Sequence, residues 1–376
     1  MLTIGIFSDL HPMQHITTGG VRLEGDCLYA IRQIGEYLNT IKLDAAFFPG
    51  DLLDAVRADG SELKLLKQLF NTIDEHQQIP KFMIQGNHDK GLYAIPEICF
   101  QTVNLDGKTI KLLDTEITVA GIKYQPDQTV LRERLKEIQA DILLCHVGMQ
   151  PFANFEQEHP ITPDDFPANT LAFVGDTHIT QVYEDPESGK TIVSPGFLYP
   201  TDKTEFLHSQ PGFTVLVIAA SEDEKQQLGG KRFQLFSLTL KKRAAWNLVK
   251  QGEGAPAARD AVACWADSLD SDVRSALKPV VYVRKDQIDA YDWPDDVIPI
   301  PVNTATLSVD ADTDYEAAEA SSIVERIRQV VGVLLKDDRD QEAVTALCIE
   351  LMASDKPAAF LSDYVERTLN VQAETC

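Results

Sequence analysis

Long apolar runs are missing from this sequence of 376 residues. None approaches the roughly 18 apolar residues that a membrane-spanning helix needs, and one of the longest extends only from Phe213 to Ala220. The first residues also lack the basic segment and the length of a secretion signal. We therefore expect a cytoplasmic protein that makes no membrane contact.

Paired cysteines are missing as well. The six cysteines form no CxxC pair, and none stands in a set of cysteines and histidines with zinc-finger spacing. This pattern excludes the usual structural zinc sites and predicts reduced thiols rather than a disulfide framework.

Basic residues are scarce: 34 Lys and Arg stand against 58 Asp and Glu, which gives a net charge of −24. Such a charge argues against broad affinity for nucleic acid through the bulk surface. A nucleic-acid substrate would have to be bound at one site, by metal ions and a few basic side chains. The composition itself, 44% hydrophobic and 24% charged, is that of a folded protein and excludes disorder as the main state.

Short apolar runs alternate with amphipathic stretches as far as about residue 240, which predicts an α/β domain built in layers. Strands are expected at 3–7, 45–48, 81–84, 142–145, 171–174, 191–193, 213–219 and 233–240, and helices at 28–40, 61–77 and 128–139. A linker at 251–258 is expected to precede a small α/β unit with a helix near 258–269 and strands near 280–283 and 298–302. After an acidic hinge at 310–314 the pattern is helical. We therefore predict three parts, at 1–245, 246–311 and 312–376.

Polar side chains follow five of the predicted strands, where each strand ends. In chain order they are Asp9 and His11; Asp51 and Asp54; Asn87, His88 and Asp89; His146; and Asp176 and His178. Because the carboxyl ends of parallel strands meet at one edge of a sheet, these clusters can converge on one pocket.

The chemistry of these residues suits divalent metal ions. Carboxylate, imidazole and carboxamide groups without thiolates favour manganese, magnesium, iron or zinc in a reactive site. There are enough ligands for two ions. Asp9, His11 and His178 would hold one ion, and Asn87, His146 and Asp176 the other, with Asp51 between them. Two ions about 3.5–4 Å apart clamp the oxygens of a phosphoryl group during displacement.

The ordered motifs DxH, GDxxD, GNHD, a strand-end histidine and GxxH resemble those of the calcineurin-like metallophosphoesterases over roughly residues 1–200. The resemblance implies a domain of two sheets flanked by helices. It implies the same seven ligands: Asp9, His11, Asp51, Asn87, His146, Asp176 and His178. It also implies a catalytic role for His88, which would stabilise the transition state or protonate the leaving group. We group Asp89 with His88 as a catalytic residue, expected to orient His88 or the start of a helix.

Within that superfamily the chain is similar to SbcD-type DNA repair nucleases and their phage counterparts. Arg22 and Asp26 before the first helix, the turns at 194–198 and 211–213, and the later α/β unit and helical tail carry this likeness. It implies a capping or DNA-contact unit, and exonuclease and single-strand endonuclease activity on DNA in repair, recombination or replication. Mn²⁺ is the expected metal, with Mg²⁺ as second choice. The implied partner is an SbcC-like coiled-coil ATPase bound by the helical tail, and a homodimer is a further expectation. Arg22 and His15 are candidate substrate contacts.

Two departures from the pattern keep alternatives open. Asp176 stands where the family usually has histidine; a third carboxylate would favour hard ions. Asp54 stands where many repair nucleases carry histidine. The alternatives are a general metallophosphoesterase acting on a small substrate and a degenerate, non-catalytic scaffold subunit. Arg22 is also readable as a surface arginine, and the apolar stripe at 323–334 as core packing instead of a partner contact.

Overall fold

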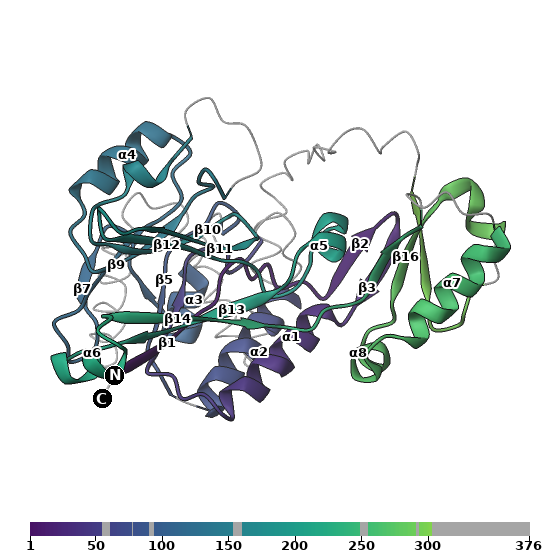
Figure 1. Cartoon of the computed structure of the whole chain (residues 1–376), viewed down its shortest axis with the longest axis horizontal. Coiled ribbons are helices and arrows are strands. Elements are labelled where there is room, and N and C mark those ends of the chain that lie inside the picture. Colours follow the sequence, from purple (N-terminus) through teal and green to yellow (C-terminus); the bar gives the residue numbers. More distant parts are fainter. Residues whose placement is uncertain are drawn as a thin grey trace, which may run out of the picture.

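The computed structural model describes residues 1–54, 61–76, 78–89, 94–152, 160–248, 255–290 and 293–302. Two sheets of six strands face each other, with helices on their outer faces and a smaller unit to one side (Figure 1). The predicted layered α/β fold is confirmed. No helix in the described ranges has both the length and the apolar content to cross a membrane.

The first sheet has the strand order β14 (Phe233–Thr239), β13 (Gly212–Ile218), β1 (Leu2–Ile6), β4 (Ala45–Phe48), β5 (Lys81–Met83) and β6 (Val103–Asn104). Strands β1, β4, β5 and β6 run parallel, whereas β13 pairs antiparallel with both β1 and β14. The carboxyl ends of β1, β4 and β5 therefore lie at one edge.

The second sheet has the order β11 (Thr180–Asp185), β12 (Lys190–Pro195), β10 (Leu171–Gly175), β9 (Ile142–His146), β8 (Thr118–Ile122) and β7 (Thr109–Lys111). Its four middle strands are parallel. All residues of β9, β10 and β12 are buried. Continuous apolar strands are typical of parallel sheets covered on both faces.

Three apolar layers hold the domain together. Ile4, Phe47 and Phe173 belong to the cluster between the sheets. The next residue along β4, Phe48, belongs instead to the layer under α1 (Asp26–Leu38) and α2 (Ser61–His76), as the alternation of side chains along a strand requires. The outer face of the second sheet packs on α4 (Gln128–Glu137). Figure 1 shows α1 and α2 on one side of the sheets and α4 on the other.

The small unit contains the parallel strands β15 (Ala245–Asn247), β16 (Val280–Arg284) and β17 (Ile298–Val302), with α7 (Ala255–Asp267), α8 (Ser271–Ala276) and a 3₁₀ helix at Lys285–Ala290. It has its own core, which includes Val262 and Val281. The opposite face of β16 presents Val280 and Tyr282 to the layer around α1 and α2. The unit is thus packed directly on the two-sheet domain.

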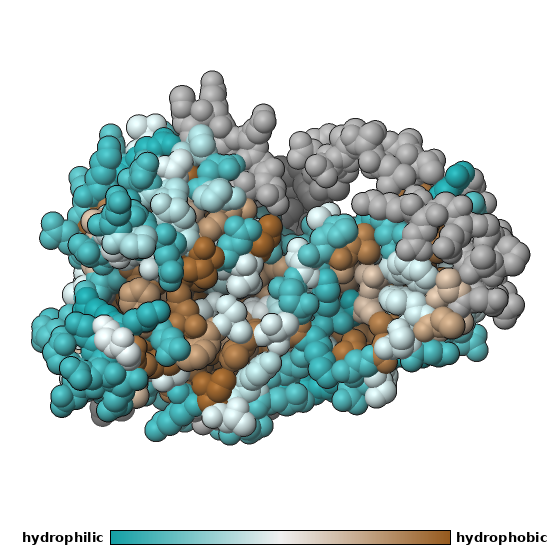
Figure 2. Space-filling view, in the orientation of Figure 1, coloured by the Kyte–Doolittle hydropathy of each residue, from teal (hydrophilic) through white to brown (hydrophobic). Residues whose placement is uncertain are grey.

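The remaining described elements are shorter. They are the hairpin β2 (His15–Thr18) and β3 (Val21–Glu24), α3 (Ala94–Phe100), a 3₁₀ helix at Pro163–Asp165, α5 (Lys203–His208) and α6 (Glu222–Gln227). Figure 2 shows one largely hydrophilic face of the molecule with separate apolar patches, and Phe236 of the outer strand β14 is among the exposed large apolar side chains.

Every strand and helix predicted up to residue 302 is present, with ends that coincide or are displaced by at most three residues. The segment 251–258 was predicted as a linker, but α7 already begins at Ala255. The strands not predicted (β2, β3, β6, β7, β8, β11 and β15) are mostly short or half exposed, so they lack the continuous apolar runs that marked the others. The acidic hinge and the predicted helical segment 312–376 lie outside the described residues, and the three domain boundaries stay predictions.

Candidate metal centre

The predicted ligands come together where the carboxyl ends of strands from both sheets meet. Strands β1, β4 and β5 of the first sheet deliver Asp9, Asp51 and Asn87 in the loops that follow them. In the second sheet His146 ends β9, and Asp176 follows β10 directly. Five sequence segments thus contribute to one site.

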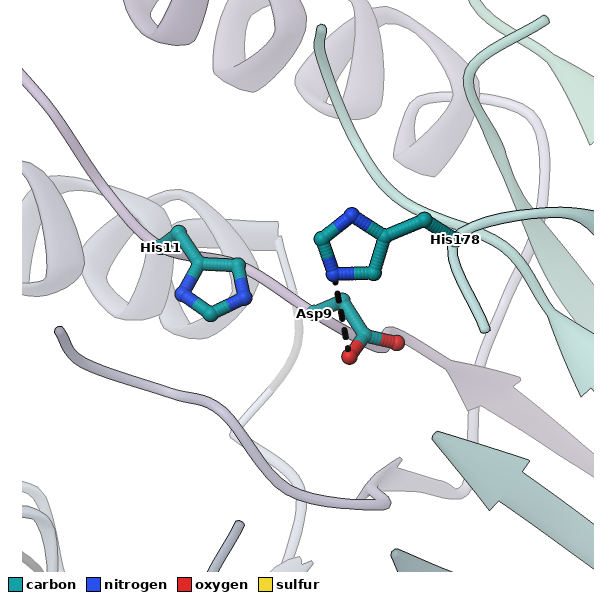
Figure 3. Close-up of side chains that lie close together, drawn as sticks. All are labelled: Asp9, His11 and His178. Atoms are coloured by element: carbon teal, nitrogen blue, oxygen red, sulfur yellow. Dashed lines mark ion pairs between the residues drawn. The ribbon is translucent and has the colours of Figure 1, made fainter. Parts of the chain in front are cut away.

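One half of the site is formed by Asp9, His11 and His178. One potential ligand atom from each of these side chains lies within 4.8 Å of the other two. His178 Nε2 is 3.6 Å from Asp9 Oδ1, and the close-up in Figure 3 shows the His11 ring beside this pair. The backbone amide of Asp176 donates a 2.9 Å hydrogen bond to Asp9 Oδ1.

The other half is centred on His146, which is fully buried. Its Nε2 lies 2.7 Å from Asn87 Oδ1 and 3.8 Å from Asp176 Oδ1. Its Nδ1 lies 2.9 Å from the carbonyl oxygen of Pro49. Because a carbonyl only accepts, Nδ1 carries the proton and Nε2 is the nitrogen offered to the site.

Asp51 joins the two halves. Its Oδ2 is 3.3 Å from His11 Nε2 and also 3.3 Å from His146 Nε2. Its other oxygen accepts a 2.9 Å hydrogen bond from the backbone amide of His88. Asp51 therefore lies between the two predicted groups of ligands, as expected of a carboxylate shared by two ions.

The buried carboxylates of the site need positive charge beside them. Asp9 and Asp51 are buried, and Asp176 lies against them. Burial would lower the pKa of His146, but the carboxylates of Asp51, Asp176 and Asp9 raise it to about 10. Protonated histidines thus balance the carboxylates in this arrangement. Divalent ions would supply the same positive charge and release those protons, so the residues present fit a pair of metal ions.

The backbone of the ligand loops is strained. Eight described residues other than glycine have positive φ angles, and five of them are predicted ligands: Asp9, His11, Asp51, Asp176 and His178. Such angles cost of order 1–3 kcal/mol each and persist only where surrounding structure imposes them. Five of the seven predicted ligands are thus held in backbone conformations that residues other than glycine rarely adopt.

Two glycines of the motifs are required by close approach. A Cβ atom on Gly86 would lie 2.0 Å from Asp51 Oδ1, and one on Gly50 would lie 2.2 Å from His146 Nδ1. Gly50 also has a φ of +101°. Any side chain at these positions would displace a ligand, because only glycine lets backbone and ligand approach so closely.

Asp89 does not face the cluster, although the sequence grouped it with the catalytic residues. Its carboxylate is fully buried and accepts hydrogen bonds from the backbone amides of Asp51, Leu53 and Gly86, at 2.7–2.9 Å. Burial, together with the charge of Asp51, raises the pKa of Asp89 to about 6. The residue ties two motif loops together and so positions Asp51.

His88 stands at the accessible side of the site. Its side chain is 40% exposed, and its Nδ1 lies 3.5 Å from Asp54 Oδ1. Its ring packs edge-on against His11, with centroids 4.8 Å apart. The interaction with Asp54 raises the pKa of His88, while burial acts against it. Since Nδ1 faces Asp54, Nε2 is the nitrogen left to meet a substrate.

The candidate substrate contacts lie on the hairpin of β2 and β3. Arg22 is on β3, exposed, with its Nε 2.8 Å from Glu24 Oε1, and His15 begins β2. His15 is not in any of the groups of potential metal ligands found among the described residues. Asp26, used with Arg22 in the likeness to nucleases, pairs instead with Arg243 in a buried contact of 2.8 Å.

Sequence reasoning missed Glu205, which lies on α5. Its Oε1 is 2.6 Å from His178 Nδ1, on the opposite side of the ring from Asp9. No motif marks it, because it lies 27 residues beyond His178 in an ordinary amphipathic segment.

Comparison with known proteins gives one family match and several similar structures. Residues 2–180 match the family model described as calcineurin-like phosphoesterase. None of the curated protein sequences matches the chain. Similar solved structures include a dimetal phosphatase from Danio rerio (9% identity, 64% of this chain and 97% of that one, TM-score 0.41).

Two others are an NAD nucleotidase from Haemophilus influenzae (10% identity, 63% of this chain and 50% of that one, TM-score 0.36) and a 5′-nucleotidase from Candida albicans (16% identity, 64% and 52%, TM-score 0.35). The chain spans about half the length of these two enzymes. The segment that matches the calcineurin-like phosphoesterase model contains the five motifs and every predicted ligand.

Proposed function

We propose that this chain is a two-metal-dependent DNA nuclease of the SbcD type, with exonuclease and single-strand endonuclease activity. The observation that best supports metal-dependent hydrolysis is the position of Asp51. One of its carboxylate oxygens lies equally close to a histidine of each ligand group. Two bound ions would lower the pKa of a bridging water and hold the phosphate oxygens.

The side chains of the site have two further roles, which are to hold the ligand groups together and to donate a proton. Asp51 and Asp9 hold the two groups of ligands in one buried cluster. His88 is the proton donor to the departing oxygen, through Nε2, since its Nδ1 faces Asp54. An acid–base group of this kind contributes about 10²–10⁴-fold to the rate.

Support for DNA as the substrate comes from the order of the structural units along the chain. The small α/β unit begins at β15, directly after the last strands of the two-sheet domain, as the capping unit does in the nucleases that the sequence resembles. We further propose that an SbcC-like coiled-coil ATPase supplies the basic DNA-binding surface that a chain with a net charge of −24 lacks.

A small phosphoester is the second candidate substrate. The acidic composition favours it, and so does the pairing of the exposed Arg22 with Glu24, which neutralises a candidate contact for the DNA phosphate. A non-catalytic scaffold is the third candidate; it requires weak metal binding and no hydrolysis.

One assay separates the three candidates. The chain is incubated with Mn²⁺ and single-stranded DNA, duplex DNA or a chromogenic phosphodiester. We expect the activity on DNA to fall by about 10²–10⁴-fold in His88→Ala and to persist in His208→Ala, which alters an exposed histidine of α5. Hydrolysis of the chromogenic ester alone would contradict the DNA proposal and favour a small substrate. No hydrolysis at all would favour the scaffold.

A further inference from the structure

The nitrogen of His178 that faces away from the cluster is held by a glutamate outside every motif. Glu205 Oε1 lies 2.6 Å from His178 Nδ1. Its Oε2 accepts hydrogen bonds from the backbone amide and the hydroxyl of Thr201, at 2.6 and 3.0 Å. Both carboxylate oxygens therefore have partners, and the side chain is buried. Glu205 cannot turn away without losing three contacts.

This contact decides which nitrogen His178 presents. A carboxylate accepts, so Nδ1 carries a proton and donates a hydrogen bond to Glu205. The ring then offers Nε2, which lies 3.6 Å from Asp9 Oδ1 (Figure 3). Partners of this kind orient metal-binding histidines and increase their basicity.

The helix that carries Glu205 is itself held at both ends. At its start, Asp202 Oδ1 accepts from the backbone amide of Glu205 at 2.9 Å. At its end, Lys242 Nζ donates to the carbonyl oxygens of Glu205 at 2.9 Å, of Phe206 at 2.7 Å, and of Ser209. Because α5 has only six residues, it is too short to be stable alone. These contacts fix it.

Lys242 also belongs to the junction with the small unit. The next residue, Arg243, is buried and bonds Asp26 at the start of α1 and the carbonyl oxygen of Lys278 in the small unit. Helix α5 itself packs on β15 of the small unit, and Figure 1 shows it on the side of the sheets that faces this unit. The segment 242–243 therefore touches the helix behind the metal ligand and the base of the small unit.

We propose that Glu205 is a positioning residue for His178, and that Lys242 joins this positioning to the junction with the small unit. The proposal rests on the proposed two-ion site and deepens it, since it predicts that one ion responds to a residue that touches no metal. That ion is the one held by Asp9, His11 and His178.

Calorimetric titration of the full chain with Mn²⁺ tests the proposal. In Glu205→Ala we expect one of the two binding events to weaken by about 10–100-fold and the other to keep its affinity. Glu205→Gln should recover part of the loss, because its amide oxygen still accepts from Nδ1–H. The matched control is Glu222→Ala, which removes an exposed glutamate of the short helix α6; it should bind like the parent chain.

Lys242→Met extends the test without altering a ligand or its direct partner. We expect a smaller weakening of the same event, whereas Lys241→Met, at the exposed neighbouring residue paired with Asp270, should have none. Thermal melts identify any variant that fails to fold; if Glu205→Ala does so, Glu205→Gln and Lys242→Met decide.

Unchanged affinity for both ions in the folded Glu205 variants would overturn the positioning role. Parent-like binding by Lys242→Met would overturn the connection to the junction. A parent chain that binds two ions but hydrolyses no phosphodiester would contradict the proposed function and leave this inference standing.

Discussion

Asp51 and His88 are neighbours in one site, but their roles in metal binding and in hydrolysis can be separated by mutation. Asp51 lies between the two ligand groups, whereas the ring of His88 faces Asp54 at the accessible edge. We expect Asp51→Asn to lose both metal binding and hydrolysis. His88→Ala should keep metal binding and slow hydrolysis by about 10²–10⁴-fold. Calorimetry and an assay on both variants measure the difference, and equal loss of metal in both would show that the roles are wrongly assigned.

The contact between His88 and Asp54 predicts a pH effect. Asp54 raises the pKa of His88, and a proton donor works only below its pKa. The rate should therefore fall as the pH rises through that pKa. In Asp54→Asn the pKa is lower, so the alkaline fall in kcat should move to lower pH while the acidic side stays in place. A pH–rate profile that is the same in both proteins would exclude His88 as the donor.

Asp176 is the residue that departs from the family pattern. Its Oδ1 lies 3.8 Å from His146 Nε2, and its pKa is raised, first by burial. If it is a ligand, Asp176→Ala should bind one ion fewer. Asp176→His should shift the preference from hard ions toward zinc or nickel. Two ions bound at full occupancy by the alanine variant would show that this position holds no metal.

At the scale of elements, α1 and the small unit are joined by a buried ion pair. Arg243 and Asp26 are 2% and 4% exposed, and Arg243 also bonds the carbonyl oxygens of Glu24 and Lys278. Removing one partner of a buried pair leaves an uncompensated charge, which costs about 3–5 kcal/mol. Arg243→Met should lower the free energy of unfolding by about this amount, measured by denaturant titration.

Lys241→Met is the control for that measurement, because Lys241 pairs with Asp270 at the surface and exposed pairs contribute little. The double variant Arg243→Met with Asp26→Asn should recover part of the loss. If Arg243→Met is as stable as the control, the buried pair does not hold the junction.

At the scale of the whole molecule, the segment 315–376 has two possible roles: it binds a partner protein, or it packs on the rest of the chain as part of the core. An apolar stripe with helical spacing, flanked by charged residues, is typical of a helix that binds a groove or a coiled coil; here it consists of Ile323, Ile327, Val330, Val331 and Leu334. We expect deletion of 315–376 to leave hydrolysis of a small phosphodiester nearly unchanged. It should abolish co-purification with the coiled-coil ATPase and the processing of long duplex DNA.

The contrary result is equally specific. If the stripe packs on the rest of the chain, the deletion exposes apolar surface. The truncated protein would then aggregate, or melt several degrees lower and lose activity on the small substrate as well. Its melting temperature and its rate on the chromogenic ester decide between the two.

The sequence by itself determined the layered α/β class and most of the buried strands, because these strands are continuous apolar runs with polar residues at their ends. It also identified the residues that converge, because parallel strands must deliver their loops to one edge. Short strands such as β6 and the hairpin β2–β3 were not predictable, since their pairing depends on partners that the tertiary structure brings close.

Only the tertiary structure decided how the site is supported. Asp89 bonds three backbone amides instead of facing the cluster, and Glu205 reaches His178 from a helix with no motif. The pairing of Asp26 with Arg243, 217 residues apart, is of the same kind. A sequence motif identifies which residue types come together in a site. Which nitrogen a histidine presents, and which loop a carboxylate holds, depends on neighbours distant in sequence, and only the packed fold brings them within hydrogen-bond distance.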